Sequence, residues 1–126
     1  MPTTPMISTL ESYLKLTASR EQTISSNMAN VDTPGYHTRD INFQSELSKA
    51  MNGVLNQSAD GTGTMQMSPV VQEVKGLMER ADGNNVNLDR EGLLMSQTQL
   101  QYQIGVQLVK HQFHQILSAI NGGGQG

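Results

Sequence analysis

Apolar residues recur at alternating spacings of three and four in two long stretches of the chain, one near each end. In the first stretch, residues 6–31, six of eight seam positions are apolar, which is typical of a helical heptad seam with a polar gap in its centre. The pattern predicts one long helix that ends at Thr33-Pro34-Gly35-Tyr36, because Pro34 disfavours helix at Thr33 and Gly35 suits the positive φ of a tight turn. The seam consists of Ile7, Leu10, Leu14, Thr17, Glu21, Ile24, Met28 and Val31.

The second stretch predicts a still longer helix, which begins after Asn87 as its N-cap and ends near Ile120. One uninterrupted seam follows it at Leu88, Gly92, Met95, Gln99, Tyr102, Val106, Val109, Phe113, Ile116 and Ile120. A second apolar stripe lies on another face at Leu93, Leu100, Ile104 and Leu108. A helix with two apolar stripes needs two neighbours. Pairing of the two long helices within one chain would therefore leave the second stripe for other chains.

Between the long helices the signals are weaker. Residues 37–43 suggest an extended arm, residues 44–55 a short helix, residues 56–64 a loop, and residues 70–80 another helix that Gly76 weakens. The expected fold is all-α: an elongated, coiled-coil-like pair of long N- and C-terminal helices with a weakly structured middle.

Three segments follow from these patterns. Residues 1–43 hold the N-terminal helix, the turn and the extended arm. Residues 44–81 form a variable, loop-rich middle, and residues 82–126 hold the C-terminal helix and a Gly-rich tail.

The composition indicates a surface that other chains cover. The chain has 126 residues, no Trp, two Phe, 36% hydrophobic residues and only 15% charged residues. Ser, Thr, Asn and Gln supply 43 of its residues, and Lys110 is the one Lys, Arg, Asp or Glu between residues 93 and 120. A soluble monomer usually keeps a charged surface, whereas amides can pair with other subunits without the desolvation cost of a charge.

Charge and cysteine content narrow the function classes. The net charge of −3 provides no basic field for a nucleic-acid backbone. The absence of cysteine excludes disulfides and thiolate chemistry. No apolar run approaches the roughly 18 residues of a membrane span. The first six residues have neither a positive region nor an apolar run, so we expect any export to use a route without a cleaved signal peptide.

Two motifs carry a specific resemblance. The stretch Asn27 to Tyr36 is similar to the A-N-x-x-T-P-G-[YF] signature of flagellar axial proteins, through Asn27, Ala29, Asn30, Thr33, Pro34, Gly35 and Tyr36. The stretch Asp82 to Glu91 resembles the D-G-N-x-V-x-L-x-x-E block of proximal-rod proteins, through Gly83, Asn84, Val86, Asn87, Leu88 and Glu91. Leu100-Gln101-Tyr102-Gln103 matches the continuation of that block. The chain thus resembles the bacterial flagellar basal-body rod protein family, over residues 6–43 and 80–120. Gly105 departs from the family pattern, which has a better helix former there, and is expected to soften the helix locally.

The resemblance implies a mechanical role without catalytic residues, cofactor or metal. It implies a subunit of the proximal rod that is exported unfolded through the type III apparatus. This subunit would assemble in the periplasm with its own copies, the rod proteins FlgC and FlgF and the adaptor FliE. The tubular drive shaft so formed would transmit torque, surround the export channel and be required for motility. The expected helix interfaces are Ile7, Leu10, Leu14, Ile24, Met28, Leu100, Tyr102, Ile104, Leu108, Val109, Phe113 and Ile116.

Other interpretations remain open on the sequence alone. The alternative most similar to this interpretation is another short rod protein, of the FlgC type. The block from Asp82 to Glu91 argues against it. A soluble helical adaptor or export chaperone would need a charged exposed face, which the C-terminal helix lacks. His111 and His114 share a helix face but have no carboxylate partner on that helix after Glu91, so we interpret them as interface residues and not as metal ligands.

Overall fold

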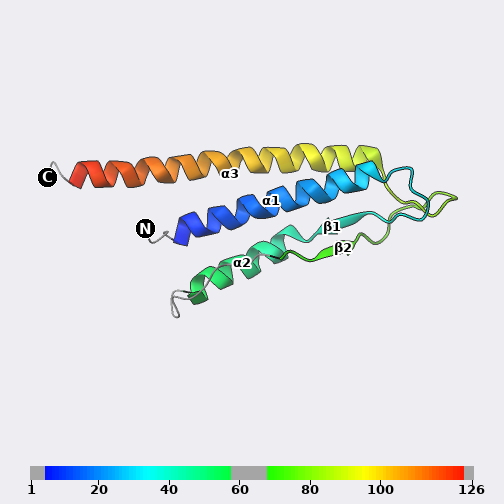
Figure 1. The fold of residues 1–126 in the computed structure, drawn as a ribbon, viewed down its shortest axis with the longest axis horizontal. Helices are drawn as coiled ribbons and strands as arrows, with labels where there is room; N and C mark the ends of the chain where they lie inside the picture. The colour runs from blue at the N-terminus through cyan, green and yellow to red at the C-terminus, as the bar shows by residue number, and fades with distance from the viewer. Residues whose placement is uncertain (1–4, 58–67, 124–126) are drawn as a thin grey trace.

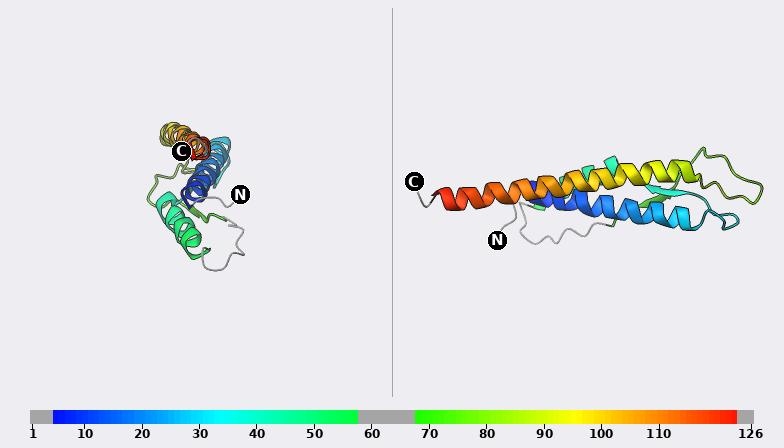
Figure 2. Two further views of the ribbon diagram at one scale, coloured as in Figure 1. Left: turned by 90° about the vertical axis from the view of Figure 1, so that its left-hand side faces the viewer. Right: turned by 90° about the horizontal axis from the view of Figure 1, so that it is seen from above.

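The computed structural model describes residues 5–57 and 68–123. Its elements, in chain order, are α1 (Pro5–Ala29), β1 (Arg39–Ile41), α2 (Phe43–Gln57), β2 (Val71–Glu73) and α3 (Leu88–Gly123). Helices α1 and α3 run side by side along an elongated molecule, and α2 and the small sheet lie against α1 (Figures 1 and 2). The expected all-α fold with two long terminal helices is confirmed, and a two-stranded sheet is added to it.

The ends of both long helices follow local chemistry. Helix α1 ends at Ala29, a few residues before Pro34, as the turn signature predicts. Helix α3 begins directly after Asn87, whose side-chain Oδ1 accepts a hydrogen bond of 3.2 Å from the backbone N–H of Arg90. This is the geometry of an N-cap. The helix continues through Asn121 to Gly123, so the Gly-rich tail expected from residue 122 is helical at its start, and residues 124–126 lie outside the described residues.

The middle of the chain confirms two expectations and corrects a third. The extended arm is β1, and the short helix is α2, with slightly wider bounds than expected. The prediction of a helix at residues 70–80 is wrong, because residues 71–73 form β2. This strand pairs antiparallel with β1 and places Ile41 opposite Val71. The backbone N–H of Val74 extends this pairing to the carbonyl of Thr38 at 2.9 Å, and Gly76 has a φ of +85° that no helix contains. Residues 58–67, most of the expected loop, lie outside the described residues.

The interior holds little apolar material. The buried apolar residues of the described chain are Leu10, Leu16, Ile24, Ile41, Ala50 and Val86. More positions are buried with polar side chains: Ser12, Thr17, Asn27, Thr38, Glu46, Asn84, Asn85, Glu91 and Thr98. Such a small apolar core contributes little hydrophobic stabilisation, so polar contacts determine much of how the elements fit together.

Helix α1 is the central element and buries two sides. Its expected seam, from Ile7 to Val31, contains no exposed residue. Leu16 lies outside that seam and is nonetheless fully buried, because α1 also packs on α2 and β1. On that second side the rings of Tyr13 and Phe43 meet edge to face, with centroids 5.4 Å apart, and burial raises the pKa of the Tyr13 hydroxyl above its usual value.

The long apolar seam of helix α3 is only partly covered: Gln99 of the seam lies 3.5 Å from Glu21 of α1, but several of its large apolar residues are not buried. Leu88, Tyr102, Phe113 and Ile120 of that seam are exposed. The buried positions of α3 are instead Glu91, Thr98 and Gly105, seven residues apart. At Gly105 a Cβ atom would lie 2.7 Å from Cδ2 of Leu14, so the glycine permits the close approach of the two helices. The structure thus gives Gly105 a packing role, and α3 runs through it as one helix.

Candidate functional site

The turn after α1 has the geometry expected from its sequence. The backbone N–H of Tyr36 donates to the carbonyl of Thr33 at 3.2 Å, and Gly35 has a φ of +75°. The hydroxyl of Thr33 donates to Oδ1 of Asn30 at 3.0 Å, and Nδ2 of Asn30 donates back to the carbonyl of Ser26 at 2.8 Å. The polar side chains of the signature therefore bind one another and the last turn of α1.

The segment before α3 folds directly onto this turn. The backbone N–H of Gly35 donates to the carbonyl of Asp82 at 2.9 Å. Gly83, with a φ of +83°, packs so closely that a Cβ on it would lie 3.4 Å from the Cα of Gly35. Arg80 also donates a side-chain hydrogen bond to the carbonyl of Val31. The signature and the second block, about fifty residues apart in sequence, thus form one tip of the molecule (Figure 1).

Asn84 joins the two loops from the inside. Its side chain is fully buried, and Nδ2 donates to the carbonyls of Asn30 at 2.9 Å and Thr33 at 2.8 Å. Its Oδ1 accepts from the backbone N–H of Val86 at 2.8 Å. One amide side chain therefore holds the end of α1, the turn and the approach to α3 together. An apolar residue here would remove all three hydrogen bonds and leave the buried backbone N–H of Val86 without this acceptor.

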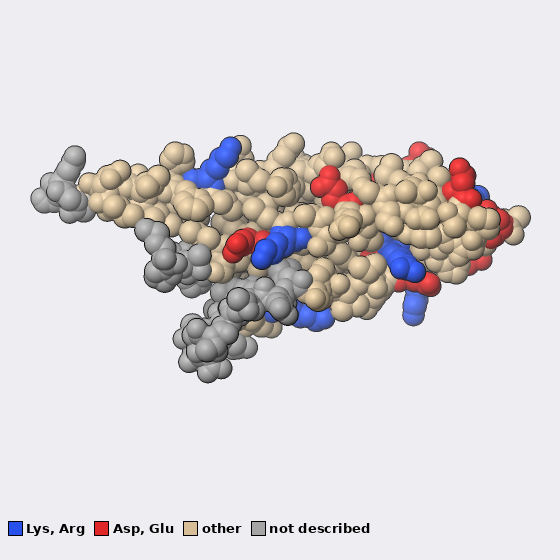
Figure 3. Space-filling view, viewed as in Figure 1, with Lys and Arg blue, Asp and Glu red and all other residues tan. Residues whose placement is uncertain are grey.

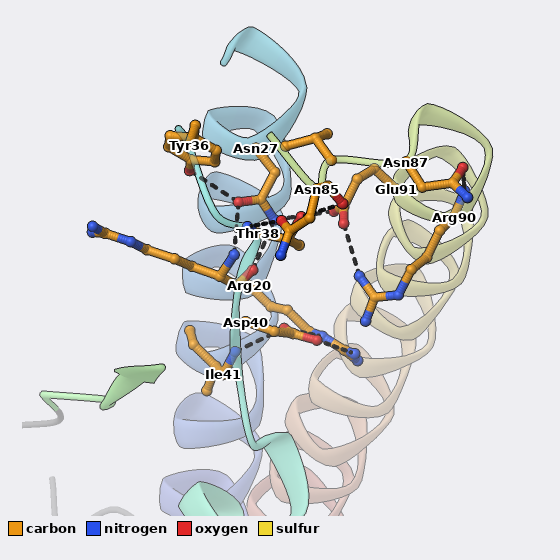
Figure 4. A network of polar contacts seen from close by, with 12 residues as sticks. Arg20, Asn27, Tyr36, Thr38, Asp40, Ile41, Asn85, Asn87, Arg90 and Glu91 are labelled. Carbon is orange, nitrogen blue, oxygen red and sulfur yellow. Dashed lines mark hydrogen bonds and ion pairs between the residues drawn. The ribbon is translucent and has the colours of Figure 1, made fainter. Parts of the chain in front are cut away.

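Asn27 occupies the centre of a second network (Figure 4). Its Nδ2 donates to the carbonyl of Arg39 at 2.7 Å and to Oε2 of Glu91 at 3.1 Å. Its Oδ1 accepts from the hydroxyl of Tyr36 and from the backbone N–H of Arg39, each at 3.0 Å. Both donors and both acceptor positions of the amide are used, so Asn27 connects α1 to β1 and to α3.

Glu91 completes this network from the first turn of α3. Its carboxylate is fully buried, with Oε2 on Asn27 and Oε1 accepting from Nη1 of Arg90 at 2.8 Å. A buried charge is tolerated only when it is paired and hydrogen-bonded, and both conditions hold here. The N-terminal position of Glu91 also places the carboxylate at the positive end of the helix dipole.

Further polar contacts fix the extended arm. The backbone N–H of Thr38 donates to Oδ1 of Asn85 at 2.6 Å, and both residues are buried. Arg20 of α1 forms a two-point ion pair with Asp40 of β1, with both nitrogen–oxygen distances at 3.1 Å. The arm therefore leaves the turn in a direction that contacts from α1 and from the second block determine together.

We name this set of contacts the tip interlock: Asn27, Asn30, Thr33, Gly35, Tyr36, Gly83, Asn84, Asn85 and Glu91. Most of it was predicted as two separate motifs. Sequence reasoning did not predict that the two motifs bind each other, and it missed Asn85, Thr38 and the Arg20–Asp40 pair. Ala29, Pro34 and Leu88, which the motifs include, have exposed side chains and take no part in these contacts.

The remaining titratable groups form no reactive constellation in the described chain. His37 lies between two carboxylates, with Nδ1 3.5 Å from Glu73 and Nε2 3.0 Å from Glu79. His111 lies 3.2 Å from the amide of Gln115. Among residues 5–57 and 68–123, no group of three His, Cys, Asp or Glu residues is placed to hold a metal ion. The tip interlock therefore holds the end of α1, the arm and the start of α3 together through hydrogen bonds.

The outer surface of α3 is unusually apolar. Its exposed large apolar residues are Leu88, Leu93, Leu100, Tyr102, Ile104, Leu108, Phe113, Leu117 and Ile120. Figure 3 shows few charged side chains toward the C-terminal end of α3, whereas acidic and basic side chains gather nearer the tip. Despite this apolar surface, none of the described helices has the length and hydropathy required to cross a membrane. An apolar surface of this extent is typical of a protein interface.

Comparison with known proteins identifies the family. Residues 7–37 match the family model described as "Flagella basal body rod protein". The flagellar basal body rod protein FlgB of Salmonella typhimurium is 34% identical over 122 residues, covering 87% of this chain and 88% of that protein. The FlgB proteins of Escherichia coli and Yersinia enterocolitica are 30% and 34% identical, covering 87% of this chain and 88% and 89% of their own lengths. This chain belongs to the family of flagellar basal body rod proteins that includes FlgB.

Proposed function

We propose that this chain is a structural subunit of the proximal rod of the flagellar basal body. Copies assemble with other rod proteins into the tubular drive shaft, which transmits torque and surrounds the export channel. Membership of the FlgB-containing family supports this role directly, and the names of these relatives favour it over a FlgC-type subunit. The role is mechanical, and we assign the chain no catalytic activity and no cofactor.

The single observation that carries the proposal is the large apolar surface that α3 leaves exposed. The side facing α1 has Glu91, Thr98 and Gly105, whereas Leu100 and Ile104 on an outer side are 58% and 49% exposed. Free apolar surface of this kind is stabilised when a neighbour covers it. A subunit surrounded by other subunits meets this requirement, and an isolated soluble domain does not.

The three segments of the chain have different roles in this proposal. Residues 1–43 and 82–126 provide the rod helices and the tip interlock, and residues 44–81 provide a variable outer part. The interlock sets the direction of the arm after Tyr36 and so determines where the arm meets the next subunit. Partners in the rod are further copies, the rod proteins FlgC and FlgF, and the adaptor FliE. Of the residues expected at helix interfaces, we assign the exposed ones to these contacts: Leu100, Tyr102, Ile104, Leu108 and Phe113. Leu10 and Ile24 are buried within the chain itself.

The subunit reaches the periplasm through the flagellar type III export apparatus, without cleavage of a signal peptide. The small apolar core supports this part of the proposal, because a fold with few buried apolar side chains is easily unfolded for passage through a narrow channel. N-terminal sequencing of the chain recovered from assembled basal bodies tests it. We expect the recovered chain to begin at one of its first few residues. A start beyond the first turn of α1 would contradict export without cleavage of a signal peptide.

Gene replacement tests the main proposal. A strain that lacks its own proximal-rod subunit is complemented with this chain or with a variant in which Asn84 is changed to Leu. We expect the chain to restore motility and rods visible by electron cryo-tomography, and the variant to restore neither. Asn52→Leu, on the exposed side of α2, serves as the matched control and should behave as the parent. If the strain without any proximal-rod subunit already built normal rods before complementation, the proposed role would be excluded.

A further inference from the structure

Two exposed apolar stripes lie on opposite flanks of the α3 side that contacts α1. The first, which we call the hollow stripe, consists of Leu93, Leu100, Ile104 and Leu108, whose exposed fractions are 71%, 58%, 49% and 46%. The second, the aromatic stripe, consists of Tyr102, Phe113 and Ile120, at 42%, 53% and 56%. With 3.6 residues per turn, the buried position Gly105 lies between Ile104 on one side and Tyr102 on the other. One neighbour therefore cannot cover both stripes.

The hollow stripe contains a shallow depression of about 410 Å³ lined by Leu100, Gln103, Ile104, Gln107 and Leu108. These positions follow the spacing i, i+3, i+4, i+7 and i+8. Four residues with that spacing form the hole that receives a side chain of a second helix in knobs-into-holes packing. The apolar residues form most of the lining, and no Lys, Arg, Asp or Glu takes part. The expected occupant is therefore a bulky apolar side chain on another helix.

The aromatic stripe of the same helix offers such a side chain. Phe113 is half exposed and lacks a polar group that would need a partner in the depression, whereas Tyr102 carries a hydroxyl. Charge does not oppose an approach of two α3 helices, since Lys110 is the one Lys, Arg, Asp or Glu between residues 92 and 123. A second copy of this chain therefore carries an exposed, bulky apolar side chain on the flank opposite the depression.

We propose that Phe113 of one copy inserts into the depression between Leu100, Ile104 and Leu108 of the next copy. The proposal rests on the proposed rod function and names its contact between copies. The interface is heterologous, with different surfaces on the two partners, so it repeats from copy to copy instead of closing a two-fold dimer. For parallel helices, the separation of nine positions from 104 to 113 corresponds to a stagger of roughly 13.5 Å along the helix axis.

Cysteine cross-linking distinguishes the heterologous contact from a symmetric one, because the native chain has no cysteine. Rods are isolated from strains that carry Ile104→Cys, Phe113→Cys, or both changes in one chain, and are treated with a short bifunctional thiol reagent. We expect a ladder of dimers and higher multimers from the double variant and no dimer from either single variant. A dimer from Ile104→Cys alone would show a symmetric interface and overturn the proposal. Ser25→Cys combined with Phe113→Cys, with Ser25 exposed on α1, is the matched control and should give no ladder.

A photoreactive phenylalanine provides a second readout that retains an aromatic ring at position 113. p-Benzoylphenylalanine replaces Phe113, the rods are irradiated, and the adducts are mapped by mass spectrometry after cleavage at Arg90 and Lys110. We expect the adduct on the peptide of residues 91–110 of another copy, which mixed isotope labelling distinguishes from an adduct within one chain. An adduct on another rod protein, or on a different part of this chain, would overturn the proposal.

The two proposals fail in distinguishable ways. If the unsubstituted chain restores motility and rods but both cross-linking readouts place position 113 elsewhere, the rod function stands and the proposed contact is wrong. If the chain restores no rods, the rod function fails first. If a variant blocks rod assembly, the photoreactive variant is irradiated instead as purified chain at high concentration. We expect the same adduct on residues 91–110 there, and its absence counts against the contact.

Discussion

The side-chain amide of Asn27 donates a hydrogen bond of 3.1 Å to the carboxylate of Glu91, 64 residues further along the chain. Both side chains are buried. The same amide also pairs with the backbone N–H and carbonyl of Arg39. Asn27 therefore connects the end of α1, the arm after the turn and the start of α3, and it joins the two sequence motifs at one tip of the molecule.

Replacing the amide of Asn27 with a carboxylate should disrupt this connection. Asn27→Asp has nearly the same shape, but it removes the donors to Arg39 and Glu91 and places two carboxylates together. Each buried group left without a partner costs about 1–3 kcal/mol. We expect few hook-bearing basal bodies and small swim rings.

Two further variants control for this substitution. Asn52→Asp makes the same change on an exposed position of α2 and should be neutral. The double variant Asn27→Asp/Glu91→Gln restores a donor opposite the introduced carboxylate and should recover part of the loss. Equal behaviour of the Asn27 and Asn52 variants would contradict this account.

Gly35→Val should lower motility without blocking export. The φ of +75° disfavours a β-branched residue by about 1–2 kcal/mol or more. A Cβ at this position meets nothing within 4 Å, so the cost comes from backbone strain alone and the arm after Tyr36 should shift. Gly35→Asn tolerates positive φ better and should show a milder defect. Swimming is measured in soft agar and export by the amount of subunit outside the cytoplasm, and normal swimming of the Val variant would refute the role of the turn.

Local features of the fold could be predicted from the sequence, and their contacts could not. The apolar period predicts both long helices, and Pro34-Gly35 predicts the turn, because these signals act within a few residues. The buried positions of α3 are Glu91, Thr98 and Gly105, none of which has a large apolar side chain that would mark it as a core position in the sequence. Their spacing of seven residues, with a glycine among them, is the one sequence feature that could have indicated a close helix contact. Residues 70–80 resemble a helix in sequence because the pairing of β2 with β1 is a distant contact that overrides local propensity.

Two glycines in α3 should respond differently to the same substitution. Gly105→Ala places a methyl group 2.7 Å from Leu14 and 3.0 Å from the ring of Tyr13, and overpacking of this kind costs typically about 1–3 kcal/mol. At Gly92 a Cβ meets nothing within 4 Å, so Ala there should gain up to about 1 kcal/mol in helix propensity. We expect isolated rods to dissociate at a lower temperature with Gly105→Ala and at an unchanged or higher temperature with Gly92→Ala. Equal shifts for the two variants would exclude a close contact at Gly105.

The isolated monomer should be only weakly folded. Helix stability comes mostly from packing, and the described chain buries few apolar side chains. We expect low helicity by circular dichroism and fast amide exchange. A cooperative thermal transition with high helicity, at micromolar concentration in a chain shown to be monomeric, would contradict this expectation.

Ile104→Glu tests whether neighbours cover the hollow stripe. Ile104 is 49% exposed in the single chain, so a carboxylate there remains in water before assembly and the monomer should be at least as soluble as the parent. If a neighbour covers this position, the charge loses its water without gaining a partner, at a cost of several kcal/mol. Cells that carry the variant should therefore lack hooks and filaments.

The soluble monomer and the loss of hooks and filaments must occur together if neighbours cover the hollow stripe. Leu117→Glu, near the C-terminal end of α3 and 54% exposed, is compared in parallel to separate a general effect of added charge from one confined to the hollow stripe. Intact flagella with Ile104→Glu would show that this stripe faces solvent or the channel. Precipitation or degradation of the monomer before export would instead place Ile104 in an internal core. In that case the chain would be a self-contained helical bundle, because the stripe would already be covered before any neighbour arrives.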